Sequence, residues 1–271
     1  MIVQHNITSM NANRQLGIVG TNLQKSTEKL SSGYRVNRAA DDAAGLAISE
    51  KMRAQVRGLQ RASDNAQDGI SLIQTAEGAM DQKHAILQRT RELVVQAANT
   101  GVLDSGSEDF QKIQDEIDNL KQEYNRIDSD TEFNKKKLLN GTYTNKYLQI
   151  GANENQGITV SIASTAWKDI SVTADMTGSA NSQLISTVDS MINAVSVERS
   201  KMGAIQNRLE YTIKVDDNTA ENMQAAESRI RDTDMADEMT RFSKESILQQ
   251  AATAMLAQAN QANQGVLSLL G

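Results

Sequence analysis

Apolar residues recur every three or four positions through most of the chain, the pattern of helices that bury one face. Between residues 12 and 30 the steps alternate 4, 3, 4, 3, 4 through Ala12, Leu16, Val19, Leu23, Ser26 and Leu30. This alternation is a heptad repeat, which brings one helical face against a partner helix. The sequence SSG then predicts a helix end, with Gly33 in the left-handed position after the last turn.

A second and longer helical pattern runs from about Asp42 to Asn99. Its 58 residues would span roughly 85 Å as one helix, a length typical of coiled coils and helical rods. Gly58, Gly69 and Gly78 either weaken this helix or allow another segment to approach it closely. The apolar stripe contains Ile48, Met52, Val56, Leu59, Ala62, Ala66, Ile70, Ile73, Ala76, Met80, Leu87 and Val94.

A third helix is predicted after the loop sequence NTGVLDSGS, residues 99–107. Ser105 and Glu108 have the spacing of a capping box, in which each side chain bonds the other residue's backbone N–H. The stripe follows as Phe110, Ile113, Ile117, Leu120, Tyr124 and Ile127.

Residues 130–177 lack the helical spacing and instead contain short apolar runs and turn residues. Asn140-Gly141 is a strong turn dipeptide. Tyr147–Ile150 and Ile158–Ile162 flank a turn rich in glycine and asparagine, and the second run alternates apolar and polar residues as a half-buried strand does. A small β-hairpin region is therefore expected at about residues 140–165.

Helical periodicity returns near Ser182 and persists almost to the end of the chain. The fourth stripe contains Leu184, Val188, Met191, Val195, Met202, Ile205 and Leu209, with Glu198 filling a gap. After the acidic residues 232–238, the last stripe contains Leu248, Ala252, Met255, Ala259, Ala262, Val266 and Leu269. The predicted fold is mainly α: a long coiled-coil-like helical rod formed by the N- and C-terminal segments, with a small β-hairpin region in the middle.

Composition supports thin helical bundles rather than a thick core. The chain has 271 residues, no proline, and 3% aromatic residues. Proline interrupts helices, and aromatic rings fill large cores. The terminal helices, built from Ala, Gln, Asn and Ser, bury too little surface on their own to offset chain entropy. They are therefore expected to pack against helices from other copies.

Charge and hydropathy narrow the range of partners and compartments. The net charge is −6 and the isoelectric point about 5.1, so the chain lacks the excess of positive charge that is typical of nucleic-acid-binding proteins. Without a run of 18 apolar residues, no membrane insertion is expected. The first residues, MIVQHNITSM, lack the pattern of a secretory signal peptide. The absence of cysteine excludes disulfides and leaves the redox compartment open.

Catalytic, metal and cofactor chemistry have little support in the sequence. The two histidines, His5 and His84, have no nearby nucleophile and carboxylate that would form a triad. Phosphate-binding glycine loops are missing. The segment DTDMADE, residues 232–238, lacks the glycine of a calcium loop and is interpreted as a solvated helix break. No enzyme activity, metal or cofactor is therefore predicted.

The stretch LSSGYRVNRAADDAAGLAIS, residues 30–49, combines two arginines with two adjacent carboxylates. Asp41 and Asp42 cannot share one helical face, so they are poorly placed to bind one metal ion. Aspartate at a helix start accepts backbone N–H bonds and stabilises the positive end of the helix dipole. We interpret the stretch as punctuation between helices, with Arg35 and Arg38 steadying it by ion pairs.

Three segments together resemble bacterial flagellins over most of the chain. They are LSSGYRVNRAADDAAGLAISEKMRAQVRGLQRASDNAQDGISLIQTAEGAM, LQRTRELVVQAAN, and RIRDTDMADEMTRFSKESILQQAATAMLAQANQANQGVLSLLG. The resemblance implies that residues 1–40 and 235–271 pair as a coiled-coil inner-tube domain, and that residues 41–234 form the outer-tube rod with its hairpin. The short segment ADMTGSANSQ implies a minimal form without added surface domains. The tail QANQ departs from the family in lacking a proline.

The resemblance also implies a function: a structural subunit that polymerises into the extracellular flagellar filament for motility. Family members leave the cell through the flagellar export apparatus without a cleaved signal peptide. The implied partners are further copies of the chain, cap and hook-associated proteins, and an export chaperone. The polymerisation residues are expected to be Leu16, Val19, Leu23, Leu30, Leu248, Met255, Val266 and Leu269. The inter-domain connector is expected to contain Gly33, Arg35, Asp41 and Asp42.

A second implied site is the helical surface that Toll-like receptor 5 recognises in some flagellins. The matching residues are Gln88, Arg89, Leu93 and Glu116, which alternatively serve subunit packing or solvation. Two other functions stay open at this point. One is a hook–filament junction protein of the flagellum, with similar terminal patterns and a divergent rod, and the other is a soluble helical adaptor.

Overall fold

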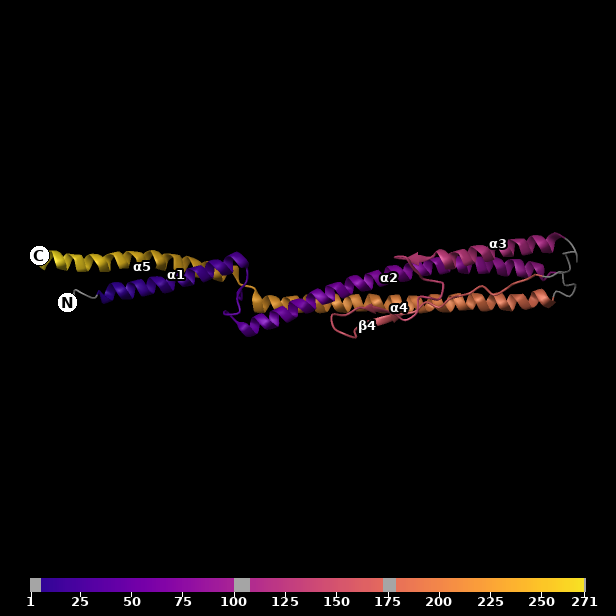
Figure 1. Ribbon diagram of the computed structural model, residues 1–271, viewed down its shortest axis with the longest axis horizontal. Coiled ribbons are helices and arrows are strands. Elements are labelled where there is room, and N and C mark those ends of the chain that lie inside the picture. Colours follow the sequence, from indigo (N-terminus) through magenta and orange to yellow (C-terminus); the bar gives the residue numbers. More distant parts are fainter. Residues whose placement is uncertain (1–5, 100–107, 173–178, 271) are drawn as a thin grey trace. The chain divides into compact units, whose positions relative to one another are not determined.

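Five helices account for most of the residues that the computed structural model describes, which are 6–99, 108–172 and 179–270. The side chains of residue 179 and of residues 262–270 are outside this description. The mainly helical fold predicted from the sequence is confirmed (Figure 1). The helices are α1 (Ile7–Ser32), α2 (Ala43–Ala97), α3 (Glu108–Asp130), α4 (Ser179–Arg231) and α5 (Met235–Leu270).

Two small antiparallel ladders lie between α3 and α4 in the sequence. Strands β3 (Lys146–Gln149) and β4 (Gly157–Val160) form the hairpin that the sequence predicted, with Leu148 opposite Ile158. Strands β1 (Glu132–Phe133) and β2 (Lys136–Lys137) form a shorter ladder that was not predicted. The sequence does not indicate this ladder, because its turn residues, Asn134 and Lys135, adopt positive φ angles of 48° and 61° without the glycine that usually marks such a turn.

Helix boundaries follow the capping residues of the sequence. The acidic segment 232–238 starts α5, where the Asp234 carboxylate accepts bonds from the backbone N–H groups of Ala236 at 2.8 Å and Asp237 at 3.3 Å. This confirms the helix break and gives Asp234 a capping role. The capping box predicted at Ser105 lies outside the described residues.

The chain divides into two compact units, which we call the terminal unit (residues 1–54 and 221–271) and the central unit (residues 55–220). In the terminal unit α1 and α5 lie side by side and antiparallel (Figure 1). The Asn6 side chain donates to the carbonyl oxygen of Ala259 at 3.0 Å, and the Ser9 hydroxyl donates to the Asn260 side chain at 2.8 Å. The start of α1 is thereby tied to the distal part of α5.

The core of the central unit is built from the stripes that the sequence predicted for its three helices. Arg91 pairs with Asp189 at 2.7 Å, and Arg199 pairs with Asp81 at 3.0 Å, so α2 and α4 run antiparallel. The core contains Ile73, Met80, Leu87 and Val94 from α2, Phe110, Ile113, Ile117 and Tyr124 from α3, and Val188, Met191, Val195, Met202 and Leu209 from α4.

Two glycines of α2 allow the β3–β4 hairpin to lie against the helix. A Cβ atom at Gly58 would lie 2.9 Å from the Ala152 Cβ, and one at Gly69 would lie 2.5 Å from a methyl group of Leu148. Of the two readings that the sequence left open, close approach is therefore the correct one at both positions. Gly78 has open space around it and no such role.

A strap of residues 163–172, neither helix nor strand, contacts all three helices of the central unit. At its centre the Thr165 carbonyl accepts a bond from the Tyr124 hydroxyl at 2.6 Å, and the Thr165 hydroxyl lies 2.6 Å from the Lys83 ammonium. Lys83 is completely buried, pairs with Asp128 and lies 4.1 Å from the centre of the Tyr124 ring. A charged group therefore fixes the strap in an otherwise apolar core.

Candidate assembly interface

The pairing of α1 with α5 covers one face of each helix. The predicted assembly residues Leu16, Val19, Leu23 and Leu30 are all half-buried on the covered face of α1, which also contains the buried Ser26. The covered face of α5 contains the half-buried Phe242, Gln249, Ala252, Leu256 and Ala259. The four leucine and valine side chains of α1 therefore pack against α5 of the same chain.

Other apolar side chains of this pair point away from it. Leu248 and Met255, predicted as assembly residues, are 41% and 65% exposed. They share a stripe with Ala252, but α5 is turned so that they lie at its outer edge. Val266 and Leu269 have side chains outside the described set. Among the side chains that the structure describes, the exposed large apolar residues of the two helices are Ile7, Met10 and Ile18 on α1, and Met235, Met239, Ile247, Leu248 and Met255 on α5.

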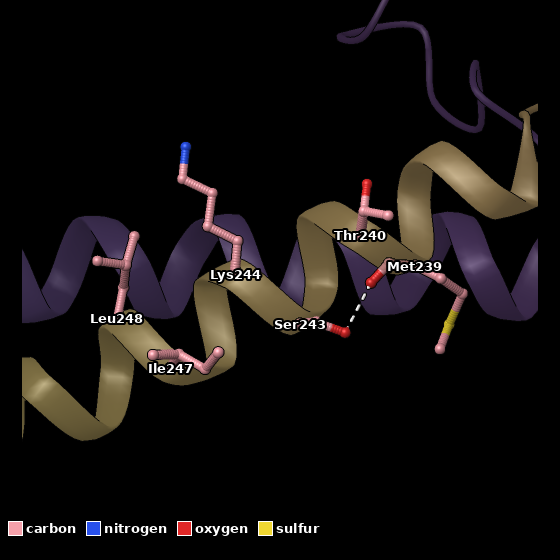
Figure 2. A pocket seen from close by; sticks show the side chains of 6 residues that line it. All are labelled: Met239, Thr240, Ser243, Lys244, Ile247 and Leu248. Carbon is pink, nitrogen blue, oxygen red and sulfur yellow. Dashed lines mark hydrogen bonds between the residues drawn. The ribbon is translucent and has the colours of Figure 1, made fainter.

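The exposed face of α5 contains a shallow apolar groove, lined by Met239, Thr240, Ser243, Lys244, Ile247 and Leu248 (Figure 2). The Ser243 hydroxyl donates to the Met239 carbonyl at 2.9 Å, and the Thr240 hydroxyl donates to the Asp237 carbonyl at 2.7 Å. Because the backbone satisfies these hydroxyl groups, the groove presents mainly carbon and sulfur to solvent. We treat this exposed apolar groove as a candidate contact surface.

The connector consists of two chain segments, residues 33–42 after α1 and residues 229–234 before α5, which bond to each other. Gly33 ends α1 with φ of 75°, and its N–H donates to the Lys29 carbonyl at 2.8 Å. Tyr34 and Asp232 form an isolated antiparallel bridge, and the Thr233 N–H donates to the Gly33 carbonyl at 3.0 Å. The segment leaving α1 is therefore joined directly to the segment entering α5.

Two charged side chains of the connector, Arg35 and Asp41, bind backbone groups of the same chain. The Arg35 guanidinium donates to the carbonyl oxygens of Ile230 at 2.6 Å and Arg229 at 3.1 Å, at the negative end of α4. The Asp41 carboxylate accepts the backbone N–H groups of Asn37 and Arg38, and these two bonds lower the pKa of Asp41. Arg35 therefore caps the end of α4, and Asp41 holds a turn within the connector.

Asp42 starts α2, since its carboxylate accepts the Gly45 N–H at 2.9 Å. Of the two aspartates considered at this helix start, the structure assigns the α2 cap to Asp42. Asp41 instead closes the preceding turn.

Sequence reasoning missed the stacked residues at the centre of the connector. The Arg231 guanidinium lies 4.6 Å from the centre of the Tyr34 ring and donates to Glu50 at 2.7 Å. The Arg53 guanidinium donates to the Tyr34 hydroxyl at 3.1 Å. An aromatic residue directly after a helix-ending glycine was the available indication, but its partners lie 19 and 197 positions away. The contact could therefore be found only in three dimensions.

The candidate receptor-contact residues lie in the central unit, across α2 and α3. The Arg89 guanidinium donates to Glu116 at 2.9 Å and to Glu92 at 2.9 Å. Gln88 is exposed beside His84, whereas Leu93 is only 2% exposed and belongs to the core. The structure thus brings Gln88, Arg89 and Glu116 to the surface and places Leu93 beneath it.

The described side chains contain no cluster of three or more His, Cys, Asp or Glu residues arranged to hold a metal ion. Among the described helices, none combines the length and apolarity of a membrane span. Long helices and a terminal pair that exposes apolar rows are features of one class of protein, the self-assembling helical structural subunits.

Comparison with known proteins places the chain within one family of that class. The family profile of the bacterial flagellin N-terminal helical region matches residues 3–144, and that of the C-terminal helical region matches residues 185–270. The chain belongs to the bacterial flagellin family.

Several curated relatives are similar over the whole of both chains. Flagellin of Halalkalibacterium halodurans is 53% identical over 274 residues, and flagellin of Bacillus subtilis is 51% identical over 304 residues. The flagellar filament 33 kDa core protein of Treponema phagedenis is 46% identical over 289 residues. Family membership makes the chain a structural filament subunit, in a family of structural proteins rather than enzymes.

Proposed function

We propose that the chain polymerises through its terminal unit into an extracellular flagellar filament that serves motility. The observation that carries this proposal is the surface of the α1–α5 pair. After the two helices have paired, eight large apolar side chains in their described part are still 41–69% exposed. Burying such a side chain from full exposure is worth about 1.5–3 kcal/mol, so covering the exposed half of each one favours the addition of further copies.

The paired helices supply different surfaces to successive copies. Contacts between two different patches that do not close into a ring produce an open helical filament. In this proposal residues 1–40 and 235–271 form the inner tube, and residues 41–234 form the outer-tube rod. Leu248 and Met255, with Val266 and Leu269, contribute to contacts between copies, while Leu16, Val19, Leu23 and Leu30 hold the pair itself.

The proposed partners other than further copies belong to the same assembly route. They are an export chaperone and the flagellar export apparatus before assembly, and the cap and hook-associated proteins at the filament ends. The groove on α5 is open in the free chain, which supports its use by a chaperone before another copy covers it.

A hook–filament junction protein is the alternative within the flagellum, and seeded growth separates the two. Purified chain is added to short filament seeds and observed by electron microscopy. Growth of long filaments supports the proposed function. Addition of a short terminal segment without further growth would favour the junction protein.

We further propose that the surface formed by Gln88, Arg89 and Glu116 is recognised by Toll-like receptor 5. The exposed Arg89–Glu116 pair contributes little to stability, so it is free to exchange partners. Arg89→Glu is expected to weaken receptor activation about tenfold, the size of one lost charged contact. Arg91→Glu is the matched control, since Arg91 is similarly exposed on α2 but pairs with Asp189 on α4. Equal effects of the two variants would argue against the proposal.

A further inference from the structure

Methionine is unusually frequent among the exposed apolar residues of the terminal unit. Among the described side chains of α1 and α5, eight large apolar ones are exposed, and four of these are methionines that are 48–67% exposed. Met10 lies on α1, and Met235, Met239 and Met255 lie on α5. In the central unit Met80, Met191 and Met202 are at most 3% exposed. One chain therefore contains an accessible and an inaccessible set of thioethers.

Met239 lies in the apolar groove of α5, and its thioether points outward from the helix (Figure 2). The groove walls are the aliphatic side chains of Ile247 and Leu248 and the stem of Lys244. In the free chain solvent reaches the sulfur directly. When another copy covers the groove, the same sulfur atom becomes buried among apolar side chains.

We infer that Met239, with Met235 and Met255, is a peroxide-sensitive modification site whose oxidation blocks addition of the subunit to a filament. This inference rests on the proposed function, because it assigns a regulatory reaction to the surface that assembles. The partner covering the site is a second copy of this chain, and the reactant is a hydroperoxide such as hydrogen peroxide.

The reaction is a two-electron oxygen transfer. The methionine sulfur attacks one peroxide oxygen, an S–O bond forms, and the O–O bond breaks. The sulfur is oxidised to a sulfoxide, and the departing hydroxide takes the proton released by the transferred oxygen and leaves as water. The product is polar and chiral, whereas the thioether is apolar and flexible, so it disrupts methionine-rich contacts.

The arrangement makes the free subunit the sensitive form. Once another copy covers α5, solvent no longer reaches these sulfur atoms, and an assembled filament resists the same treatment. Oxidation therefore acts on subunits before they add. Methionine sulfoxide reductase restores them with two external thiols, which become a disulfide while the sulfoxide oxygen leaves as water.

The test treats the full chain with graded hydrogen peroxide and then measures seeded filament growth. Peptide mass spectrometry should show oxidation of Met235, Met239 and Met255 before that of Met80, Met191 and Met202. The critical concentration for growth should rise about tenfold, equivalent to about 1.4 kcal/mol per subunit. Methionine sulfoxide reductases of both stereospecificities should restore growth.

Leucine variants identify the responsible sulfur atoms, because leucine has a similar volume and cannot be oxidised. The Met235→Leu/Met239→Leu/Met255→Leu variant should grow normally and resist peroxide. The Met191→Leu/Met202→Leu control should keep the sensitivity of the original chain. Circular dichroism confirms that both variants are folded.

The possible failures can be told apart. If untreated chain does not grow from seeds, the proposed function is wrong, and the inference falls with it. If untreated chain grows and fully oxidised chain grows equally well, the inference alone is overturned. The inference also fails if the triple leucine variant loses growth at the same peroxide concentration as the original chain.

Discussion

Lys83 shows at the residue scale how this chain uses charge inside its core. Its side chain is completely buried, and its ammonium group bonds Asp128 and Thr165. Burial lowers the pKa of Lys83, and the hydrogen bond and charge of Asp128 only partly oppose that effect. Buried ion pairs often contribute little net stability, but they favour one arrangement over others. We interpret the Lys83–Asp128 pair as the contact that fixes the position of the strap (residues 163–172) against the helices.

The depressed pKa of Lys83 predicts how stability depends on pH. The unfolded lysine binds its proton up to its usual pKa of 10.5, whereas the folded state releases it at lower pH. Between these two values the unfolded state holds more protons, so this residue makes the free energy of unfolding rise with pH. Chemical denaturation at several pH values between neutrality and 10 should show that rise.

Lys83→Met is the control for this prediction, since it removes the titrating group. The difference in free energy of unfolding between the two proteins should change with pH over that range. Tyr124 acts in the opposite direction above pH 10, because burial raises its pKa to about 12. Parallel pH profiles for the two proteins would contradict the assignment to Lys83.

Arg35 illustrates a residue whose role changed once the fold was known. It was expected to steady the connector by an ion pair, but its guanidinium instead caps the last carbonyls of α4. Arg35→Glu places a negative charge at the negative helix end and should destabilise the connector by about 0.5–1 kcal/mol. Faster hydrogen exchange at the Thr233 amide would report this change.

Arg38→Glu is the comparison for that substitution, because Arg38 is 73% exposed and bonds Glu28 rather than a helix end. It should leave exchange at Thr233 nearly unchanged. Equal acceleration in both variants would show that general charge in the connector matters rather than capping by Arg35.

At the scale of whole elements, the α1–α5 pair is much thinner than the central core. Ser26 is the buried residue of α1 among those described, whereas α3 alone buries Phe110, Ile113, Ile117 and Tyr124. Helical stability in proteins comes mainly from packing an apolar face, so the terminal helices should open more easily than α2 and α4.

Hydrogen exchange of the free chain and of filaments tests this difference. In the free chain, amides of α1 and α5 should exchange much faster than those of the core positions of α2 and α4. In filaments, the same terminal amides should become protected, because other copies then cover the exposed faces. Strong protection of α1 and α5 already in the free chain would contradict the prediction.

The sequence predicted those elements whose determinants are local. Heptad spacing, the helix-ending Gly33 and the acidic start of α5 placed the helices within a few residues, and alternation at Ile158 and Val160 placed the hairpin. Each of these signals lies within one or two turns of the structure that it specifies.

The remainder depends on contacts between distant residues. The stacking of Arg231 on Tyr34 joins positions 197 apart, and no local pattern indicates it. The orientation of α5 was also not predictable, because its apolar residues occupy more than one face. A periodic pattern therefore could not decide that Ala252 is covered while Met255 is exposed.

At the scale of the whole molecule, folding and assembly are assigned to different residues. The buried hydrophobic cluster runs from Ala66 to Leu209 and lies entirely in the central unit. The exposed apolar rows of α1 and α5 lie entirely in the terminal unit. Loss of the distal part of α5 should therefore abolish polymerisation and leave the central unit folded.

Seeded growth of a chain that ends at Glu245 measures this separation most directly. The full chain should extend filament seeds, and the truncated chain should add nothing at the same concentration. Circular dichroism and thermal unfolding should show that its central helices remain folded. If the truncated chain forms filaments of normal diameter, assembly does not depend on the distal part of α5, and the central claim is wrong.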